Sequence, residues 1–407
     1  MTLDQAKATR KQGGESRQVK FGSEHFFESG LELIKGKRIG FVTNHSAVLS
    51  DGRHEVDVLR EEDEVVVAAL FSPEHGIRGS APAGAHVESE LDPATGLQIY
   101  SLYGDHTKPE EWMLKNVDIL IYDVQDAGTR FYTYISTMAL AMEAAAEKGI
   151  PFVILDRPTI VTGNLIDGPF LHDDARSFIG MLPVPILYSM TPGELAGLIQ
   201  QEYLKPKGLE LDLTVSTLLN YKRSMWYDET GLPWVIPSPN VKTIEAATLY
   251  PGTALVEGTN LSEGRGTPYP FQYIGAPFID GVKLAASLTE LGLPGVEFDP
   301  VTFVPRFSSV VSHPRFSGEL CHGIYLRVTD RTMVKPVEAG VALVCAMRKL
   351  NPAQLKFRSD GAFDRLSGDK NIKSMIEKGA GYLEIAATWK SRLGTFDEER
   401  KKYFLYP

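Results

Sequence analysis

Five short apolar runs recur in the first part of the chain, separated by polar or helix-like stretches. They are Arg38–Val42, Val65–Phe71, Leu97–Leu102, Val117–Tyr122 and Pro151–Leu155. Each run is as long as a strand and is almost unbroken by polar residues, which is typical of strands buried on both faces of a parallel sheet.

Helical patterns lie between and after these runs. Apolar residues recur at helical spacing within Phe131–Lys148. The segment Thr191-Pro-Gly-Glu194 is a capping box with proline at the first helical position, and it predicts a helix over Glu194–Leu204. The alternation of strands and helices predicts an α/β fold with a Rossmann-like, doubly wound and mostly parallel sheet.

The length of 407 residues predicts two domains, each with its own core. The stretch Leu232–Arg265 is rich in proline and glycine, and we expect it to form extended loops that lead into the second domain. Beyond it we expect a strand over Leu320–Val328, a helix over Val337–Leu350 and helices within Asn371–Leu393. The predicted division is a disordered tail at residues 1–20, a Rossmann-like catalytic domain at 21–245, and a smaller α+β domain at 246–407 that completes the cleft.

The net charge of −10 makes a nucleic acid an unfavourable partner. Cys321 and Cys345 are the only cysteines, which excludes a disulfide framework and a cysteine-rich zinc module. No apolar stretch approaches the roughly 20 residues of a membrane span. No signal peptide is recognisable at the N-terminus, so the chain as written is expected in the cytoplasm, or outside it if an export signal has been removed.

Polar side chains follow four of the apolar runs, where the carboxyl ends of parallel strands would bring them to one crevice. They are Asn44 and His45 after the first run, Glu74 and His75 after the second, Asp123 and Asp126 after the fourth, and Asp156 and Arg157 after the fifth. Four such strand ends together favour a ligand site over simple helix capping.

The sequence lacks the motifs of several common binding and catalytic sites. The chain has no G-x-G-x-x-G after the first strand, no phosphate-binding P-loop, no H-E-x-x-H and no G-x-S-x-G. We expect no cofactor and no bound metal. Because His45, His75, Asp123 and Asp156 have ligating side chains, a metal-assisted hydrolase at the same crevice remains an alternative.

Carboxylate acid–base chemistry fits these residues best. Glu74 follows a strand directly, where burial favours a protonated carboxyl that can donate to a glycosidic oxygen. Asp123, Asp126 and Glu263 are candidates for the second carboxylate, and Tyr132 is a candidate to stack on a sugar ring. Adjacent residues on an extended segment point to opposite sides, so Glu74 and His75 are not expected to share one face.

Six segments, FVTNHSAV, LFSPEHGIRG, IYDVQDAGTRFYTYIST, PFVILDRP, LPWVIPSPN and VEGTNLSEGRGTPYPF, resemble the exo-β-N-acetylmuramidases, the NamZ-like peptidoglycan-recycling glycosidases. The likeness runs from about Lys37 to the terminal KKYFLYP. It implies a Rossmann-like domain, a smaller C-terminal domain and a cleft between them. It also implies release of N-acetylmuramic acid from the non-reducing end of peptidoglycan fragments, with Glu74 as the acid. A muropeptide-binding protein without turnover is the other alternative.

The resulting predictions name a catalytic set and a substrate-binding set. The catalytic residues are Glu74, Glu263 and Asp123. The residues expected to bind a muropeptide or disaccharide are Asn44, His45, His75, Arg78, Asp126, Arg130, Tyr132, Asn260 and Arg265. Arginines belong to this set because N-acetylmuramic acid carries a lactyl carboxylate, which a guanidinium binds with matching geometry.

Overall fold

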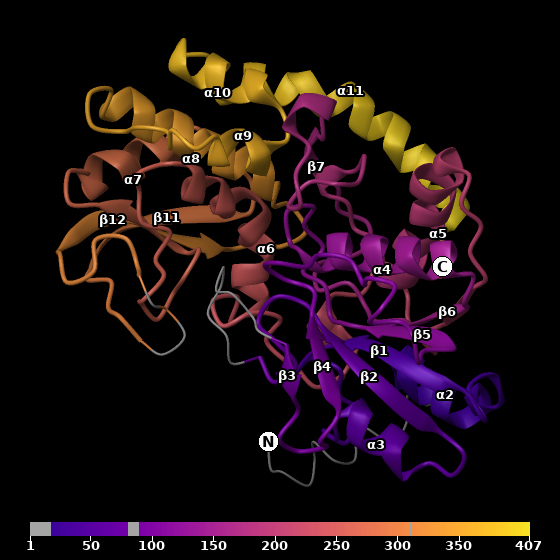
Figure 1. Ribbon diagram of the computed structural model, residues 1–407. Helices are drawn as coiled ribbons and strands as arrows, with labels where there is room; N and C mark the ends of the chain where they lie inside the picture. The colour runs from indigo at the N-terminus through magenta and orange to yellow at the C-terminus, as the bar shows by residue number, and fades with distance from the viewer. Residues whose placement is uncertain (1–17, 80–88, 309–310, 312) are drawn as a thin grey trace, which may run out of the picture.

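A seven-stranded sheet organises the first part of the chain in the computed structural model, which describes residues 18–79, 89–308, 311 and 313–407 (Figure 1). The strand order is β3-β4-β2-β1-β5-β6-β9, and only the β3–β4 pair is antiparallel. The strands are Arg38–Thr43 (β1), Val66–Ser72 (β2), Glu90–Leu91 (β3), Gln98–Ser101 (β4), Ile119–Asp123 (β5), Phe152–Leu155 (β6) and Leu213–Ser216 (β9). All five apolar runs form strands here, so the predicted Rossmann-like sheet is confirmed.

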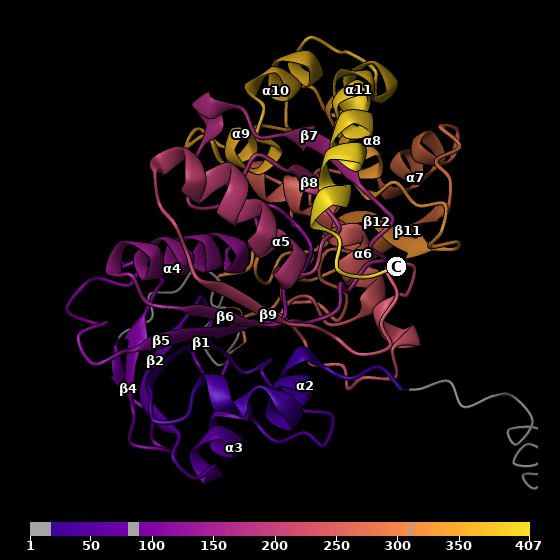
Figure 2. The same cartoon turned by 90° about the vertical axis from the view of Figure 1, so that its right-hand side faces the viewer.

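Helices cover both faces of this sheet (Figure 2). On one face lie α2 (Gly22–Ser29) and α3 (Glu55–Glu61), and on the other α4 (Tyr134–Lys148) and α5 (Pro192–Ile199). Along β1, Ile39 and Phe41 pack into the core beneath α2 and α3, whereas Val42 packs into the core beneath α4. Successive side chains point to opposite faces, and both faces are buried, which explains the unbroken apolar runs.

The two predicted helices of this domain are present with shifted bounds. The helix α4 begins at Tyr134 rather than Phe131, so residues 131–133 form part of the preceding loop. The capping box opens α5: the Thr191 hydroxyl accepts from the Glu194 N–H, and the Thr191 N–H donates to the Glu194 carboxylate, both at 3.2 Å.

The C-terminal part forms the expected smaller α+β domain. Its antiparallel sheet has the order β10-β12-β11, with strands Tyr273–Ala276 (β10), Val296–Phe303 (β11) and Cys321–Val328 (β12). Its helices are Ile244–Thr253 (α6), Gly281–Thr289 (α7), Pro336–Leu350 (α8), Ala362–Ser367 (α9), Lys370–Glu377 (α10) and Tyr382–Arg400 (α11). No helix in the described part of the chain is long and apolar enough to cross a membrane.

The expectation of extended loops throughout Leu232–Arg265 is wrong. The helix α6 and a 3₁₀ segment, Ala254–Gly258, lie within it. Thr243 caps α6 by accepting from the Ala246 N–H at 3.1 Å, and Pro251 sits inside the helix although it reads as a breaker in the sequence. The predicted boundary near residue 246 therefore falls within α6.

Of the predicted tail, residues 1–17 lie outside the described residues. The remaining residues of that range make defined contacts. Val19 is buried, and the Lys20 backbone bonds with that of Leu219.

A β-hairpin of β7 (Asp167–Phe170) and β8 (Pro185–Leu187) reaches from the first domain to the C-terminal helices (Figure 1). The Asp167 carboxylate accepts from the N–H groups of Val337 and Glu338 at the start of α8, at 2.8 and 3.2 Å. In the opposite direction, the chain end returns to the first domain, where the Tyr406 hydroxyl donates to the buried carboxylate of Asp156. The two domains are therefore joined by a hairpin of the first domain and by the C-terminal end of the chain.

Arg130 is a fully buried link between the domains. Its guanidinium donates to four backbone carbonyls at 2.7–3.2 Å, those of Pro169, Val184, Leu366 and Ser367. The first two lie in or beside the β7–β8 hairpin and the last two in α9. Burial lowers the pKa of Arg130 to about 9. This position removes Arg130 from the predicted sugar-binding set, because both terminal nitrogens donate to backbone carbonyls and Arg130 does not line the described cavity.

Replacing Arg130 with lysine should lower the free energy of unfolding by roughly 2–5 kcal/mol, because an ammonium cannot reach four carbonyls with the planar fork of a guanidinium. Urea unfolding measures the change. The matched control is Arg176→Lys, at an exposed pair with Asp173, which should stay within about 0.5 kcal/mol of wild type. Equal effects of the two substitutions would contradict the role of Arg130.

Candidate active site

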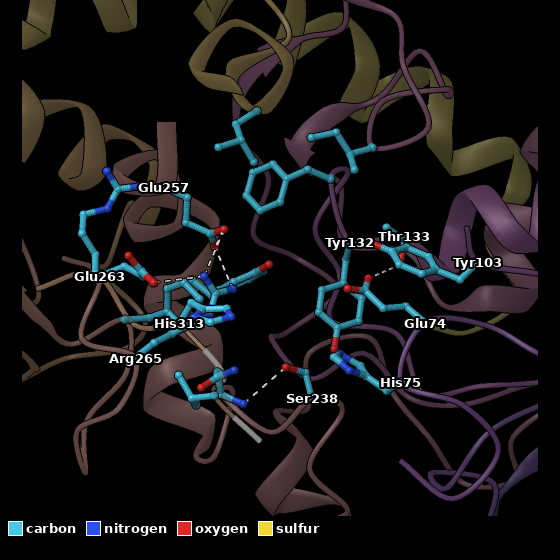
Figure 3. Close-up of a pocket in the computed structure, with 18 of the residues that line it drawn as sticks. Glu74, His75, Tyr103, Tyr132, Thr133, Ser238, Glu257, Glu263, Arg265 and His313 are labelled. Carbon is cyan, nitrogen blue, oxygen red and sulfur yellow. Dashed lines mark hydrogen bonds and ion pairs between the residues drawn. The ribbon is translucent and has the colours of Figure 1, made fainter. Parts of the chain in front are cut away.

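A polar cavity of about 560 Å³ lies between the two domains. Figure 3 shows side chains facing one another across it. One wall comes from the loops after β2, β4 and β5, and carries Glu74, His75, Tyr103, Tyr132 and Thr133. The opposite wall comes from the C-terminal domain and carries Glu257, Glu263, Arg265, His313, Arg315 and Arg358. Chemistry in this cavity thus draws on both domains.

Glu74 presents a half-buried carboxylate to this cavity. The Thr133 hydroxyl donates to its Oε2 at 2.8 Å. The Tyr103 phenol also lies against it: burial, with the charge and hydrogen bonding of Glu74, raises the pKa of Tyr103 far above its usual range. Two hydroxyl groups, those of Thr133 and Tyr103, therefore orient Glu74.

His75 lines the same cavity as Glu74. The expectation that they point to opposite sides is wrong, because the segment is not extended. His75 has a φ of 75°, in the left-handed region, and the Gly76 N–H donates to the Pro73 carbonyl at 3.1 Å. Holding a non-glycine residue there costs about 1–3 kcal/mol, and such strain is commonly kept at functional sites.

Two carboxylates share one guanidinium on the opposite wall. Arg265 donates to Glu263 at 3.1 Å and to Glu257 at 3.2 Å, and its guanidinium lies over the Phe271 ring. Burial raises the pKa of Glu257, and the charge of Arg265 opposes that rise. The charges of these two carboxylates raise the pKa of Arg265 in spite of its burial.

Asn240 lies on the cavity wall between these two sides, next to Ser238. Its side chain is buried, and neither Oδ1 nor Nδ2 has a hydrogen-bond partner in the described part of the protein. A buried amide without partners is unfavourable, so this group is suited to receive a polar ligand.

Family models cover nearly the whole described chain. The model described as exo-β-N-acetylmuramidase NamZ, N-terminal, matches residues 39–245, and its C-terminal counterpart matches residues 248–406. The peptidoglycan β-N-acetylmuramidase NamZ of Bacillus subtilis (strain 168) is 45% identical over 398 residues, covering 98% of this chain and 94% of the relative. This chain belongs to the NamZ family.

Two solved structures of DUF1343 family proteins from Bacteroides fragilis NCTC 9343 share the fold. One superposes with a TM-score of 0.88 at 34% identity and covers 96% of this chain and 99% of its own. The other has a TM-score of 0.78 at 36% identity, with coverages of 95% and 99%. The resemblance inferred from the six sequence segments is thereby confirmed.

The cavity of this NamZ-family chain contains five of the residues predicted from the sequence: Glu74, His75, Tyr132, Glu263 and Arg265. Other lining residues were not predicted from the sequence, notably Tyr103, Thr133, Asn240, Glu257, Arg315 and Arg358. Tyr103 follows the third apolar run, so the rule used for the other strand ends points to it as well. Asn240 and Glu257 lie within the family-like segments LPWVIPSPN and VEGTNLSEGRGTPYPF.

Asp123 is not on the cavity wall formed by the described residues, and its predicted catalytic role does not fit its surroundings. It is fully buried and paired with the buried guanidinium of Arg157, which also contacts Glu55 at 2.9 Å. Burial and the charge of Asp123 together raise the pKa of Glu55. Asp123 is therefore part of an internal charge network.

Four further predicted substrate ligands have partners within the protein and do not line the described cavity. Asn44 Oδ1 accepts from the Ser46 hydroxyl at 2.6 Å, His45 Nε2 donates to the Ile236 carbonyl at 2.8 Å, Arg78 pairs with Asp92 at 2.8 Å, and Asn260 Nδ2 donates to the Gln354 carbonyl at 2.9 Å. These loops are polar because their own turns and contacts need hydrogen bonds.

Asp126 is also buried away from the cavity. It accepts from the Tyr188 hydroxyl and from the Gly128 N–H, the latter at 2.6 Å. Burial raises its pKa to about 6, in spite of these donors. Asp126 thus holds the loop after β5 rather than a sugar.

Across the described residues, no group of three or more His, Cys, Asp and Glu side chains is arranged to hold a metal ion.

The raised pKa of Asp126 makes a pH-dependent prediction for Asp126→Asn. Because folding raises this pKa from 3.8 to about 6, the carboxyl's contribution to stability is complete below about pH 4 and is lost as the pH rises through 6. Asparagine does not titrate, so its stability does not change with pH at this site. The free energy of unfolding of the variant should therefore rise by about 2–3 kcal/mol relative to that of wild type between pH 4 and 7.

Urea unfolding at several pH values measures this difference. Asp173→Asn, at a side chain 91% exposed, is the control and should show a difference independent of pH. A flat difference for Asp126→Asn would show that burial does not perturb this carboxyl.

Proposed function

We propose that this chain is an exo-acting β-N-acetylmuramidase that releases N-acetylmuramic acid from the non-reducing end of peptidoglycan fragments. The observation that carries the proposal is the placement of Glu74 across the interdomain cavity from Glu263 and Glu257. Glycoside cleavage needs two carboxyl groups on opposite sides of the scissile bond. The name of the B. subtilis relative supplies the substrate class.

Glu74 is the proposed proton donor. Its carboxyl lies at the cavity surface, oriented by the Thr133 hydroxyl at 2.8 Å and by the Tyr103 phenol. In the protonated form it can transfer its proton to the glycosidic oxygen as the bond to the leaving sugar breaks.

Glu263 is the proposed second carboxylate, which stabilises the oxocarbenium-like centre or activates a water molecule. Arg265 fixes the orientation of Glu263 through its 3.1 Å contact and is itself held by Glu257. Tyr132 and Tyr250 supply aromatic surface for the sugar ring, and Asn240 supplies an amide that has no partner among the described residues for its polar substituents. In this proposal the N-terminal domain, residues 21–245, provides the acid, and residues 246–407 provide the second carboxylate.

Turnover of chromogenic sugars tests the function directly. We expect cleavage of an aryl β-N-acetylmuramide and at least about tenfold slower cleavage of the matching β-N-acetylglucosaminide. The second sugar has no lactyl carboxylate, so the cavity groups that bind this carboxylate are left without a partner. Equal rates on the two sugars would contradict the proposed specificity, but the protein would still be a glycosidase. Tight binding without any turnover would instead indicate a muropeptide-binding protein.

Glu74→Gln should reduce kcat on a disaccharide substrate by about 10²–10⁴-fold, the usual contribution of a general acid. Glutamine keeps the size of the side chain, so the melting temperature should change little. An aryl glycoside with a good leaving group needs less protonation, so its loss should be much smaller.

His75→Ala is the matched comparison because His75 shares the cavity wall with Glu74. A role for His75 in binding predicts similar losses on both kinds of substrate. If His75→Ala abolishes turnover on every substrate while Glu74→Gln leaves it intact, Glu74 is not the acid.

A further inference from the structure

Three arginines line the interdomain cavity, and they differ in how their charge is balanced. Arg265 pairs with Glu257 and Glu263, and Arg358 pairs with Asp360. Arg315 forms no ion pair with any residue in the described part of the chain, and its buried Nε has no hydrogen-bond partner there. Within the described residues, Arg315 is thus the cavity arginine with neither an ion pair nor a hydrogen bond.

The surroundings of Arg315 make this state unfavourable without a ligand. Its guanidinium is partly buried, and burial together with the nearby charge of Arg358 lowers its pKa. The carboxylates of Glu263 and Glu257 lie near enough to attract it, but both are already bound to Arg265. An arginine remains charged at neutral pH, so the free cavity holds a cation that is partly stripped of water and has no ion-pair partner among the described residues.

We propose that Arg315 binds the carboxylate of a sugar acid and so determines the choice of an N-acetylmuramic acid unit over an N-acetylglucosamine unit. The inference rests on the proposed function. The two sugars differ by the lactyl ether, which adds one carboxylate, and a guanidinium offers two parallel N–H donors to such a group. Arg315 lies on the same wall as Glu263, so an anion bound there places the attached ring inside the cavity.

The test compares two synthetic substrates that differ only at this group: an aryl β-N-acetylmuramide with a free lactyl carboxylate, and the same compound with a lactyl carboxamide. Wild type should prefer the acid. Arg315→Gln should lower kcat/KM for the acid by about 10–100-fold, mainly through KM, because a charge-assisted hydrogen-bonded pair is lost. For the carboxamide, kcat/KM should change by no more than about threefold, so the preference collapses.

Three other variants are controls for the effect of Arg315→Gln. Arg315→Lys keeps the charge but not the fork, so it should retain an intermediate preference for the acid. Arg358→Gln removes a cavity arginine that already has a carboxylate partner, so it should lower the preference less than Arg315→Gln does. Arg327→Gln, on β12 at an exposed pair with Glu297, serves as the surface control. Melting temperatures verify that each variant is folded.

The proposal is overturned if folded Arg315→Gln keeps the full preference for the acid, or if Arg358→Gln alone abolishes it. If wild type cleaves neither substrate, the proposed function fails instead. Calorimetric titration with N-acetylmuramic acid and N-acetylglucosamine then still decides the role of Arg315, since only the acid should bind more weakly to Arg315→Gln. Equal binding of N-acetylmuramic acid to wild type and Arg315→Gln would reject it.

Discussion

The buried guanidinium of Arg130 fixes how the C-terminal domain sits on the Rossmann-like sheet. It is buried from water, and its two terminal nitrogens have hydrogen-bond partners only when the carbonyls of Pro169, Val184, Leu366 and Ser367 surround them. Gly368 makes room for it: a Cβ at that position would lie 2.2 Å from Arg130 Nη2. Because an unsatisfied buried cation is costly, the two domains cannot separate or rotate freely without loss of these contacts.

The cavity depends on that constraint through a short stretch of chain. Arg130 belongs to the same loop as Tyr132 and Thr133, which ends where α4 begins at Tyr134. Thr133 in turn orients Glu74, while Glu263 and Glu257 are held on the other domain by Arg265. The contact of Arg130 with α9 thus helps to set the spacing between the proposed acid and the carboxylates that face it.

The sheet was predictable from the sequence because a strand that is buried on both faces needs apolar residues at nearly every position, which gives an unbroken apolar run. The sequence predicted the site only in part. Glu74 and His75 follow β2 and line the cavity, whereas Asn44 and Asp123, at the ends of β1 and β5, are bound internally. A polar strand end has the same appearance in a sequence whether it serves a ligand or a buried network.

The cavity residues of the second domain were even harder to predict from the sequence. Glu257, Arg315 and Arg358 come from segments with no periodic pattern that would direct them to the cavity, and only the tertiary fold brings them beside Glu263. Nothing in the sequence around Arg130 and Arg315 distinguishes an internal structural arginine from one that faces the cavity. The distinction is physical: Arg130 is surrounded by carbonyls, and Arg315 has none among its described contacts.

A crystal structure of Glu74→Gln with a disaccharide that ends in N-acetylmuramic acid tests the central claim, that the interdomain cavity is where the sugar is cleaved. We predict the terminal ring between Tyr132 and Glu263, with the glycosidic oxygen about 3 Å from the residue-74 amide. A sugar bound instead at the ends of β1 and β5, near Asn44 and His45 and out of reach of residue 74, would contradict this account.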